Sequence, residues 1–154
     1  MLVDNALMSK YNGDMKIDNT IFLMGRISEK AACYLRAEME KIGLCRLAPS
    51  HGDILANLFK YRSLSMARLA EVVHRDPSTV TALVGKLRQR GFVETRKEEA
   101  DNRVTLVELT EAGLALEPAF REISQALYEI EYRGMTQDER TQLQGLLKKI
   151  NDNF

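Results

Sequence analysis

The fold is decided by the stretch Asp76-Pro-Ser-Thr-Val-Thr-Ala-Leu-Val-Gly-Lys-Leu-Arg-Gln-Arg-Gly91. Aspartate before a proline is a helix start signal, because aspartate can cap the first turn and proline lacks only an N–H that would be unpaired there. A glycine after the last turn is typical of a helix end. Apolar residues recur between these signals at i, i+3, i+4 and i+7, namely Val80, Leu83, Val84 and Leu87. We therefore predict an amphipathic helix over 77–90.

Three further helices are predicted upstream. Apolar residues at helical spacing from Ile17 to Met39 predict one long amphipathic helix over 17–41. Pro49 can open a second helix that runs to about Tyr61. Ser65 is a suitable N-cap for a short third helix, which leaves a tight turn at 74–75 before the helix at 77–90.

Downstream, the apolar period changes. Residues 92–97 and 104–109 are short and rich in Val, Thr and Leu, and the polar run 98–103 joins them, which predicts a β-hairpin. Thr110 is expected to cap a fifth helix, in which Pro118 either introduces a kink or lies where the lost hydrogen bond is tolerated. A capping box at 136–139 opens the last predicted helix.

Two short helices, a tight turn and a β-hairpin form the layout of a winged helix-turn-helix. The fold class is therefore mainly α with a small β-hairpin wing. In this geometry the second helix enters the DNA major groove, and its first residues face base edges. Ser78, Thr79 and Thr81 are suited to base edges or phosphates there, whereas Lys86 and Arg88 suit phosphates. The alternative is that the hydroxyl groups only cap the helix.

Composition and charge bound the class of protein. The chain has 154 residues, of which 45% are hydrophobic and 29% charged, which suits one compact domain or two small lobes. No apolar run approaches the roughly 18 residues of a membrane helix, and residues 1–10 lack a secretory signal pattern. We expect a cytoplasmic protein.

The charges are unevenly distributed although they cancel overall. Residues 64–97 carry 7 basic and 3 acidic side chains, whereas residues 111–154 carry 5 basic and 8 acidic ones. A basic middle beside an acidic C-terminal segment is consistent with one surface for a polyanion and another for a different partner. Charge imbalances of this size also occur on ordinary solvated surfaces, so the sequence motifs must decide whether the basic region binds nucleic acid.

Three motifs carry a resemblance to a known family. They are Ser78-Thr-Val-Thr-x-Leu-Val-x-x-Leu-x-x-x-Gly-Phe-Val93, Asp101-Asn-Arg103 and Leu109-Thr-Glu-Ala-Gly113. Together they resemble the MarR family of bacterial transcriptional regulators, most closely over residues 64–113. One long helix before this region and two after it are similar to the family's dimerisation region, so the likeness covers nearly the whole chain.

The resemblance implies a homodimer on pseudo-palindromic double-stranded DNA, acting as a ligand-responsive repressor. It implies a winged helix-turn-helix DNA-binding domain over 47–110 and a helical dimerisation region over 1–46 and 111–154. A small aromatic or phenolic effector would bind between the two regions, and no cofactor or metal is implied. The wing-tip Arg103 would enter the minor groove, and Asp101 would brace the wing, pair with Arg103 or simply end a turn. The candidate DNA-binding residues are Ser65, Arg75, Pro77, Ser78, Thr79, Thr81, Lys86, Arg88, Arg96, Lys97, Asp101 and Arg103.

This chain departs from the family pattern in two places. His74 lies where the family often has glycine, so a different backbone conformation is expected at that turn. Asn102 replaces a commonly basic wing residue, and Glu98 and Glu99 add negative charge to the same loop. We expect weaker or more salt-sensitive DNA binding.

Other functions remain open. A winged helix can bind protein instead of DNA, and Cys33 or Cys45 could sense oxidants. Cys45 lies beside Arg46, which favours a thiolate, whereas Cys33 is expected to be a packing residue. His51 would either line a ligand cavity or be a partly exposed polar residue. Because no catalytic triad, phosphate-binding loop or metal-ligand spacing is present, we do not expect an enzyme. The operator, the regulated genes, the effector and the choice between repressor and activator cannot be predicted from the sequence.

Overall fold

The computed structural model describes residues 19–154, and the predicted helices and both hairpin strands are present in it. Ile17 and residues 1–10, on which the long-helix and leader predictions partly rest, lie outside the described residues. In chain order the elements are α1 (Thr20–Lys41), α2 (Pro49–Tyr61), β1 (Ser63–Ser65), α3 (Met66–Val72), α4 (Pro77–Gln89), β2 (Val93–Lys97), β3 (Thr105–Leu109), α5 (Glu111–Leu114), α6 (Glu117–Glu131) and α7 (Gln137–Asn151).

The wing contains one strand more than the sequence predicts. The antiparallel sheet has the order β1-β3-β2, and β1 pairs with β3 so that Leu64 faces Val107. Strand β1 has three residues, too few to show a period of two, and it becomes a strand only because β3 lies beside it. The extra strand ties the hairpin to the chain just before α3.

The core is built from the predicted stripes. Val80, Val84 and Leu87 of α4 are buried, and so are Ile54, Leu55 and Leu58 of α2, while Leu83 is half-buried. Each such side chain contributes about 1.5–3 kcal/mol when it leaves water. Leu44 and Leu47, from the loop before α2, complete the same cluster together with Leu69, Val93 and Val107.

Proline and glycine mark the element ends. Gly91 follows α4 with φ 75°, in the left-handed region that glycine adopts without strain. Pro118 lies in the first turn of α6, where its missing N–H leaves no helix bond unmade. The helix predicted after Thr110 is therefore two helices, α5 and α6. The Thr110 side chain caps α5 by accepting from Gly113, as expected.

The turn between α3 and α4 is held by a residue other than glycine. His74 has φ 51°, so it adopts the left-handed conformation that usually falls to glycine. The backbone N–H groups on both sides of this position are paired: His74 donates to Glu71 and Arg75 donates to Ala70. These hydrogen bonds offset part of the strain.

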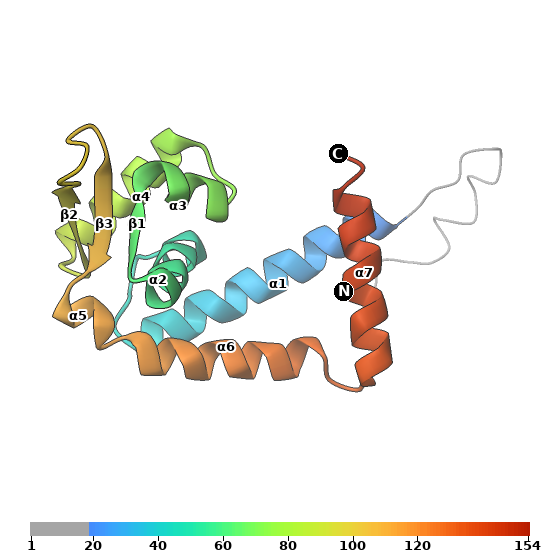
Figure 1. The fold of residues 1–154 in the computed structure, drawn as a ribbon. Helices are drawn as coiled ribbons and strands as arrows, with labels where there is room; N and C mark the ends of the chain where they lie inside the picture. Colours follow the sequence, from blue (N-terminus) through green and yellow to red (C-terminus); the bar gives the residue numbers. More distant parts are fainter. Residues whose placement is uncertain (1–18) are drawn as a thin grey trace.

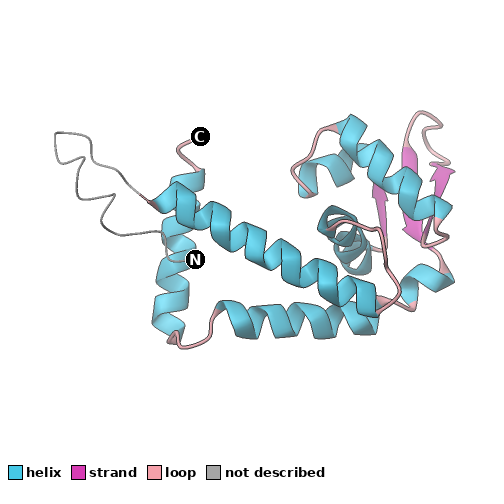
Figure 2. Cartoon of the chain, turned by 180° about the vertical axis from the view of Figure 1, so that it is seen from behind, coloured by secondary structure: helices cyan, strands magenta, loops and turns pink. Residues whose placement is uncertain are grey.

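The elements divide the molecule into two ends. Figure 1 shows the sheet, α2, α3 and α4 gathered at one end of α1, while α7 crosses the other end. Helix α6 runs between these ends along α1, and seen from behind all three strands lie at the first end (Figure 2). No helix of residues 19–154 is long and apolar enough to span a membrane.

Gly113 offers a test of the junction between the sheet and α5. A Cβ at this position would collide with the Phe92 carbonyl oxygen. We expect Gly113→Ala to lower the free energy of unfolding by about 2 kcal/mol or more, because the backbone must shift to relieve the overlap. Urea denaturation measures this change.

Gly85→Ala is the matched control, since its Cβ would meet nothing within 4 Å and its φ is not positive. Alanine is the better helix former by up to about 1 kcal/mol, so we expect no loss of stability. Equal stability of the Gly113→Ala variant and the wild type would contradict the packing of α5 against Phe92.

Candidate nucleic-acid interface

One face of α4 is free of packing. With Val80, Val84 and Leu87 buried, the opposite ridge is exposed and consists of Ser78, Ala82, Gly85 and Gln89. We call these four residues the α4 ridge. Of these four, only Ser78 was among the DNA-binding residues predicted from the sequence. The other three could have been found, because the four residues follow one another at intervals of three or four positions, which places them on one side of a helix. The small side chains at 82 and 85 permit close approach of a second molecule to the helix backbone.

The hydroxyl groups at the start of α4 are already used as donors. Ser78 Oγ donates to one Asp76 carboxylate oxygen at 2.6 Å and Thr79 Oγ1 donates to the other at 2.9 Å, while Thr81 Oγ1 donates to the Pro77 carbonyl at 2.8 Å. Each hydroxyl oxygen keeps lone pairs, so it can still accept a hydrogen bond, as from the exocyclic amine of a base.

The Asp76 carboxylate changes the electrostatics of this helix start. The hydrogen bonds from Ser78 and Thr79 hold the pKa of Asp76 below its usual range, so it is negatively charged at neutral pH. This negative charge partly cancels the positive potential at the start of α4. The start of the helix is therefore less favourable for phosphate than the sequence predicted. The hydroxyl groups there are better suited to bind base edges than phosphates.

Lys86 and Arg90 point away from the α4 ridge, toward the loop that joins α1 to α2. Lys86 Nζ donates to the Arg46 carbonyl at 2.7 Å, and Arg90 donates to the carbonyls of Cys45 at 3.0 Å and Gly43 at 3.2 Å. The predicted phosphate contact of Lys86 would require it to leave this carbonyl. The arrangement instead ties the C-terminal half of α4 to the end of α1.

Arg88 of α4 and the cations of β2 are hydrogen-bonded to residues of the wing. Arg88 Nη1 donates to Thr95 at 3.3 Å. Arg96 forms an ion pair with Glu108 at 2.8 Å, and Lys97 Nζ donates to Thr105 at 3.0 Å. These contacts are solvent-exposed, and exposed pairs of this kind contribute little stability, so the side chains can exchange them for phosphate oxygens at little cost.

The wing tip presents Arg103 to solvent. Asp101 Oδ1 accepts the Arg103 backbone N–H at 2.9 Å, and the Asp101 carbonyl accepts from Val104 at 2.9 Å. Asp101 therefore braces the turn, one of the three roles considered for it, while the Arg103 guanidinium forms no hydrogen bond or ion pair with residues 19–154. A free arginine at a braced tip is suited to a narrow groove of negative potential.

The remaining candidates have mixed placements. Ser65 Oγ accepts from the Arg68 N–H at 3.1 Å and so caps α3, as predicted. Arg75 is exposed in the turn between α3 and α4, close enough for its charge to act on Asp53. Pro77 is the first residue of α4 and serves the helix start.

His51 is buried, which corrects the expectation of a partly exposed side chain. Only 4% of it is exposed. It occupies the third position of α2, and its Nδ1 accepts the Ala48 backbone N–H at 3.0 Å, so the ring folds back onto the helix start and is covered there. Burial lowers the pKa of His51, and the nearby Lys86 charge lowers it further.

Both cysteines are exposed in this chain, so Cys33 does not pack in the core as expected. Helix α1 turns this position outward, because its buried side is the one that carries Met39. Cys45 Sγ lies 3.9 Å from the Glu40 carbonyl. Residues 19–154 hold no cluster of three or more His, Cys, Asp or Glu side chains that could bind a metal.

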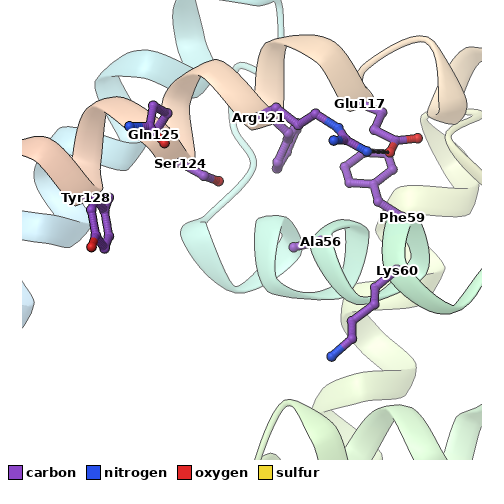
Figure 3. Close-up of a pocket in the computed structure, with 9 residues that line it drawn as sticks. Ala56, Phe59, Lys60, Glu117, Arg121, Ser124, Gln125 and Tyr128 are labelled. Carbon is purple, nitrogen blue, oxygen red and sulfur yellow. Dashed lines mark hydrogen bonds and ion pairs between the residues drawn. The ribbon is translucent and has the colours of Figure 1, made fainter. Parts of the chain in front are cut away.

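A groove lies between α2 and α6, away from the α4 ridge. Its outer part is shown in Figure 3 and includes Phe59, Lys60 and Arg121. Glu117 at its end accepts from Arg121 at 2.7 Å and from Arg62 at 3.1 Å, so it links the chain just after α2 to α6, and these partners lower the pKa of Glu117.

The inner part of the groove, which we call the inner pocket, is more enclosed. It has a volume of about 330 Å³ and lies among α1, α2 and α6. Pockets of this size commonly hold small molecules. Its walls are mostly apolar. The lining residues are Leu35, Met39, Pro49, Gly52, Asp53, Ala56, Phe120, Ile123, Ser124, Leu127, Tyr128 and Glu131.

These features define the class of protein. Helices α3 and α4, the turn at His74 and the strands of the wing form a winged helix-turn-helix with its second helix exposed. Residues 47–105 match the MarR family model.

Three comparisons extend this match. The regulator SarZ of Staphylococcus haemolyticus is 33% identical over 92 residues, which cover 59% of this chain and 61% of SarZ. The structure of a mutant of Escherichia coli MarR complexed with operator DNA has a TM-score of 0.73 at 24% identity, covering 88% of this chain and 99% of that one. Bordetella bronchiseptica BpsR, whose DNA binding is regulated by 6-hydroxynicotinic acid, has a TM-score of 0.74 at 20% identity, covering 87% and 99%.

Residues 47–105 therefore form a domain of the MarR type, and the curated relatives that resemble the chain include proteins named as transcriptional regulators and repressors. The chain spans about three fifths of the length of the SarZ relative.

The buried histidine predicts an acid-sensitive fold. Because the pKa of His51 is lowered from 6.5, the unfolded chain binds more protons than the folded one just below pH 6.5. Stability is therefore expected to fall as the pH drops from 6.5 to the lower folded pKa. Melting temperatures measured between pH 8 and pH 5 test this.

His51→Gln is the informative variant, since glutamine can make the same capping contact but does not titrate. We expect its melting temperature to change less over this pH range than that of the wild type. Identical pH profiles for the two proteins would show that His51 protonation is not coupled to folding.

Proposed function

We propose that this chain is a homodimeric, sequence-specific regulator of transcription in the cytoplasm, most simply a repressor that releases double-stranded DNA when a small ligand binds. The observation that carries the proposal is the exposed α4 ridge beside a braced wing with a free Arg103. The division proposed is a DNA-binding domain over 47–110 and a helical dimerisation region over 1–46 and 111–154.

The geometry of the class supports one arrangement of the proposed DNA contact. The α4 ridge would enter the major groove, and Arg103 would enter the neighbouring minor groove. Two symmetric copies would read a pseudo-palindrome with half-site centres about 34–36 Å apart, one turn of DNA. The negative charges of Asp76, Glu98 and Glu99 would weaken the attraction to phosphate, and the cations that do contact phosphates would make the binding depend on salt.

The dimer contact is supported by unpartnered apolar surface. Helix α7 has no buried residue in this chain, although Leu146 and Leu147 are large apolar side chains. Ile21, Phe22 and Ile27 at the start of α1 are each more than 60% exposed. Contiguous exposed apolar groups of this kind mark an interface, and a symmetric partner would cover both helices.

The inner pocket is the proposed effector site. It is bounded by α2 of the DNA-binding domain and by α1 and α6 of the helical region. A small aromatic or phenolic ligand held there would alter how the domain sits on the helices, and it would release DNA if it binds better to the conformation that does not fit the operator.

Fluorescence anisotropy with the protein's own upstream intergenic DNA and a scrambled duplex tests the function directly. Tight, selective binding that weakens steeply between about 50 and 200 mM salt would support the regulator. Weak binding to both duplexes by a confirmed dimer would overturn it and favour a winged helix that binds protein.

The wing assignment predicts the effect of one substitution. Arg103→Ala should weaken operator binding about tenfold or more and lower the slope of log affinity against log salt by about two, one cation contact for each protomer. The dimer should persist in sedimentation. Arg36→Ala, an exposed arginine of α1, is the control and should bind as the wild type does. Unchanged binding by Arg103→Ala would show that the wing does not contact DNA.

The dimer assignment predicts the effect of a charge on α7. Leu147→Glu should weaken self-association about 100-fold or more, because each protomer buries a charge where a leucine was covered. Sedimentation velocity measures the shift toward monomer, with circular dichroism as a check on folding. Gln142→Glu adds the same charge to the same helix at an exposed polar position and should remain dimeric. If both variants remain dimeric, the dimer interface does not include Leu147 and lies elsewhere.

A further inference from the structure

The charged residues that line the inner pocket are all of one sign. Among its lining residues the charged side chains are Asp53 on α2 and Glu131 on α6, and both are acidic. Lysine, arginine and histidine are absent from the lining, whereas the outer part of the groove includes Lys60 and Arg121. The two parts of the groove therefore differ in the charge they present to a ligand.

Neither acidic side chain of the inner pocket is neutralised by a close partner. Within residues 19–154 neither carboxylate forms an ion pair or a side-chain hydrogen bond. Arg75 is the cation whose charge acts on Asp53, yet partial burial outweighs it and raises the pKa of the Asp53 carboxyl. A positively charged group placed beside Asp53 would stabilise the ionised carboxylate and so offset the effect of its partial burial.

The other cations near the pocket are already engaged with neighbouring side chains. Arg121 pairs with Glu117 at 2.7 Å. Arg140 lies over the Tyr128 and Tyr132 rings, and its Nη1 donates to the Tyr128 hydroxyl at 3.3 Å. The polar side chains that line the inner pocket are thus two carboxylates and the hydroxyl groups of Ser124 and Tyr128, and the rest of the lining is mostly apolar.

We propose that the inner pocket selects an aromatic ligand that carries a protonated amine, with Asp53 and Glu131 holding the amine and the walls formed by Phe120 and Ile123 holding the ring. This choice of ligand class rests on the proposed ligand-responsive function. It departs from an aromatic acid such as the 6-hydroxynicotinic acid of BpsR. A ligand carboxylate in this pocket would lie near two like charges, and none of the lining residues is a cation that could pair with it.

The test compares three probes that share one ring and differ in charge: 2-(1-naphthyl)ethylamine, 2-(1-naphthyl)ethanol and 1-naphthylacetate. Calorimetry on the full dimeric chain at pH 7 measures binding. We expect the amine to bind about tenfold or more tighter than the alcohol, and the acid to bind most weakly, because a charged hydrogen-bonded pair exceeds a neutral one by this order. An acid that binds as tightly as the amine would overturn the proposal, and so would the absence of binding by all three probes.

Variants locate the charge effect. The double change Asp53→Asn with Glu131→Gln keeps side-chain shape and removes both charges, so the amine should bind no better than the alcohol. Glu122→Gln, on an exposed position of α6 outside the pocket lining, should keep the preference. Melting curves confirm that each variant is folded. An amine preference that survives the double change would place the selective charge elsewhere.

DNA binding separates failure of this inference from failure of the proposed function. Anisotropy with operator DNA is measured on the same wild-type sample, without probe and then with each probe. Operator binding together with no amine preference rejects the ligand class and leaves the regulator in place. Failure to bind the operator rejects the proposed function, whichever probe the pocket prefers.

Discussion

The packing of α4 determines which face of this helix is available for the proposed contact with DNA. Val80, Val84 and Leu87 lie on one side of the helix and are buried against α2, α3 and the sheet. Three fixed side chains leave the helix no freedom to rotate about its axis, since rotation by one residue would expose leucine and bury a polar group. The opposite ridge is therefore held outward as a rigid surface, and the wing is held beside it by the same core.

The same helix is connected to the rest of the chain through its cations. Lys86 and Arg90 bind the carbonyl groups of the loop after α1, while Glu117 on α6 binds Arg62 just after α2. Both contacts join the winged helix to the long helices, and both are exposed enough to break at low cost. The inner pocket lies among α1, α2 and α6. A ligand there would push on α2 and α6 directly, which provides a physical route from pocket to α4.

Local signals predicted most of the fold. Pro77, Gly91, Thr110 and the capping box at Thr136 act on their own turns, so the sequence alone locates the corresponding helix ends. The third strand was missed because β1 depends on a partner 43 positions away in the chain, Leu64 facing Val107. The burial of His51 was missed for a different reason: the prediction from the sequence did not consider that its ring could fold back and accept the Ala48 backbone N–H.

The residues of the candidate site also fall into those that the sequence predicts and those that only the structure reveals. By itself, the sequence determined the apolar stripe of α4, the hydroxyl groups at its start and the arginine at the wing tip, since these depend on spacing along one element. Only the tertiary structure decided that Lys86 turns to the loop after α1 and that two carboxylates line a mostly apolar pocket. Contacts between elements depend on how helices pack in three dimensions, and periodicity along the chain carries no information about which side chain a distant segment brings near.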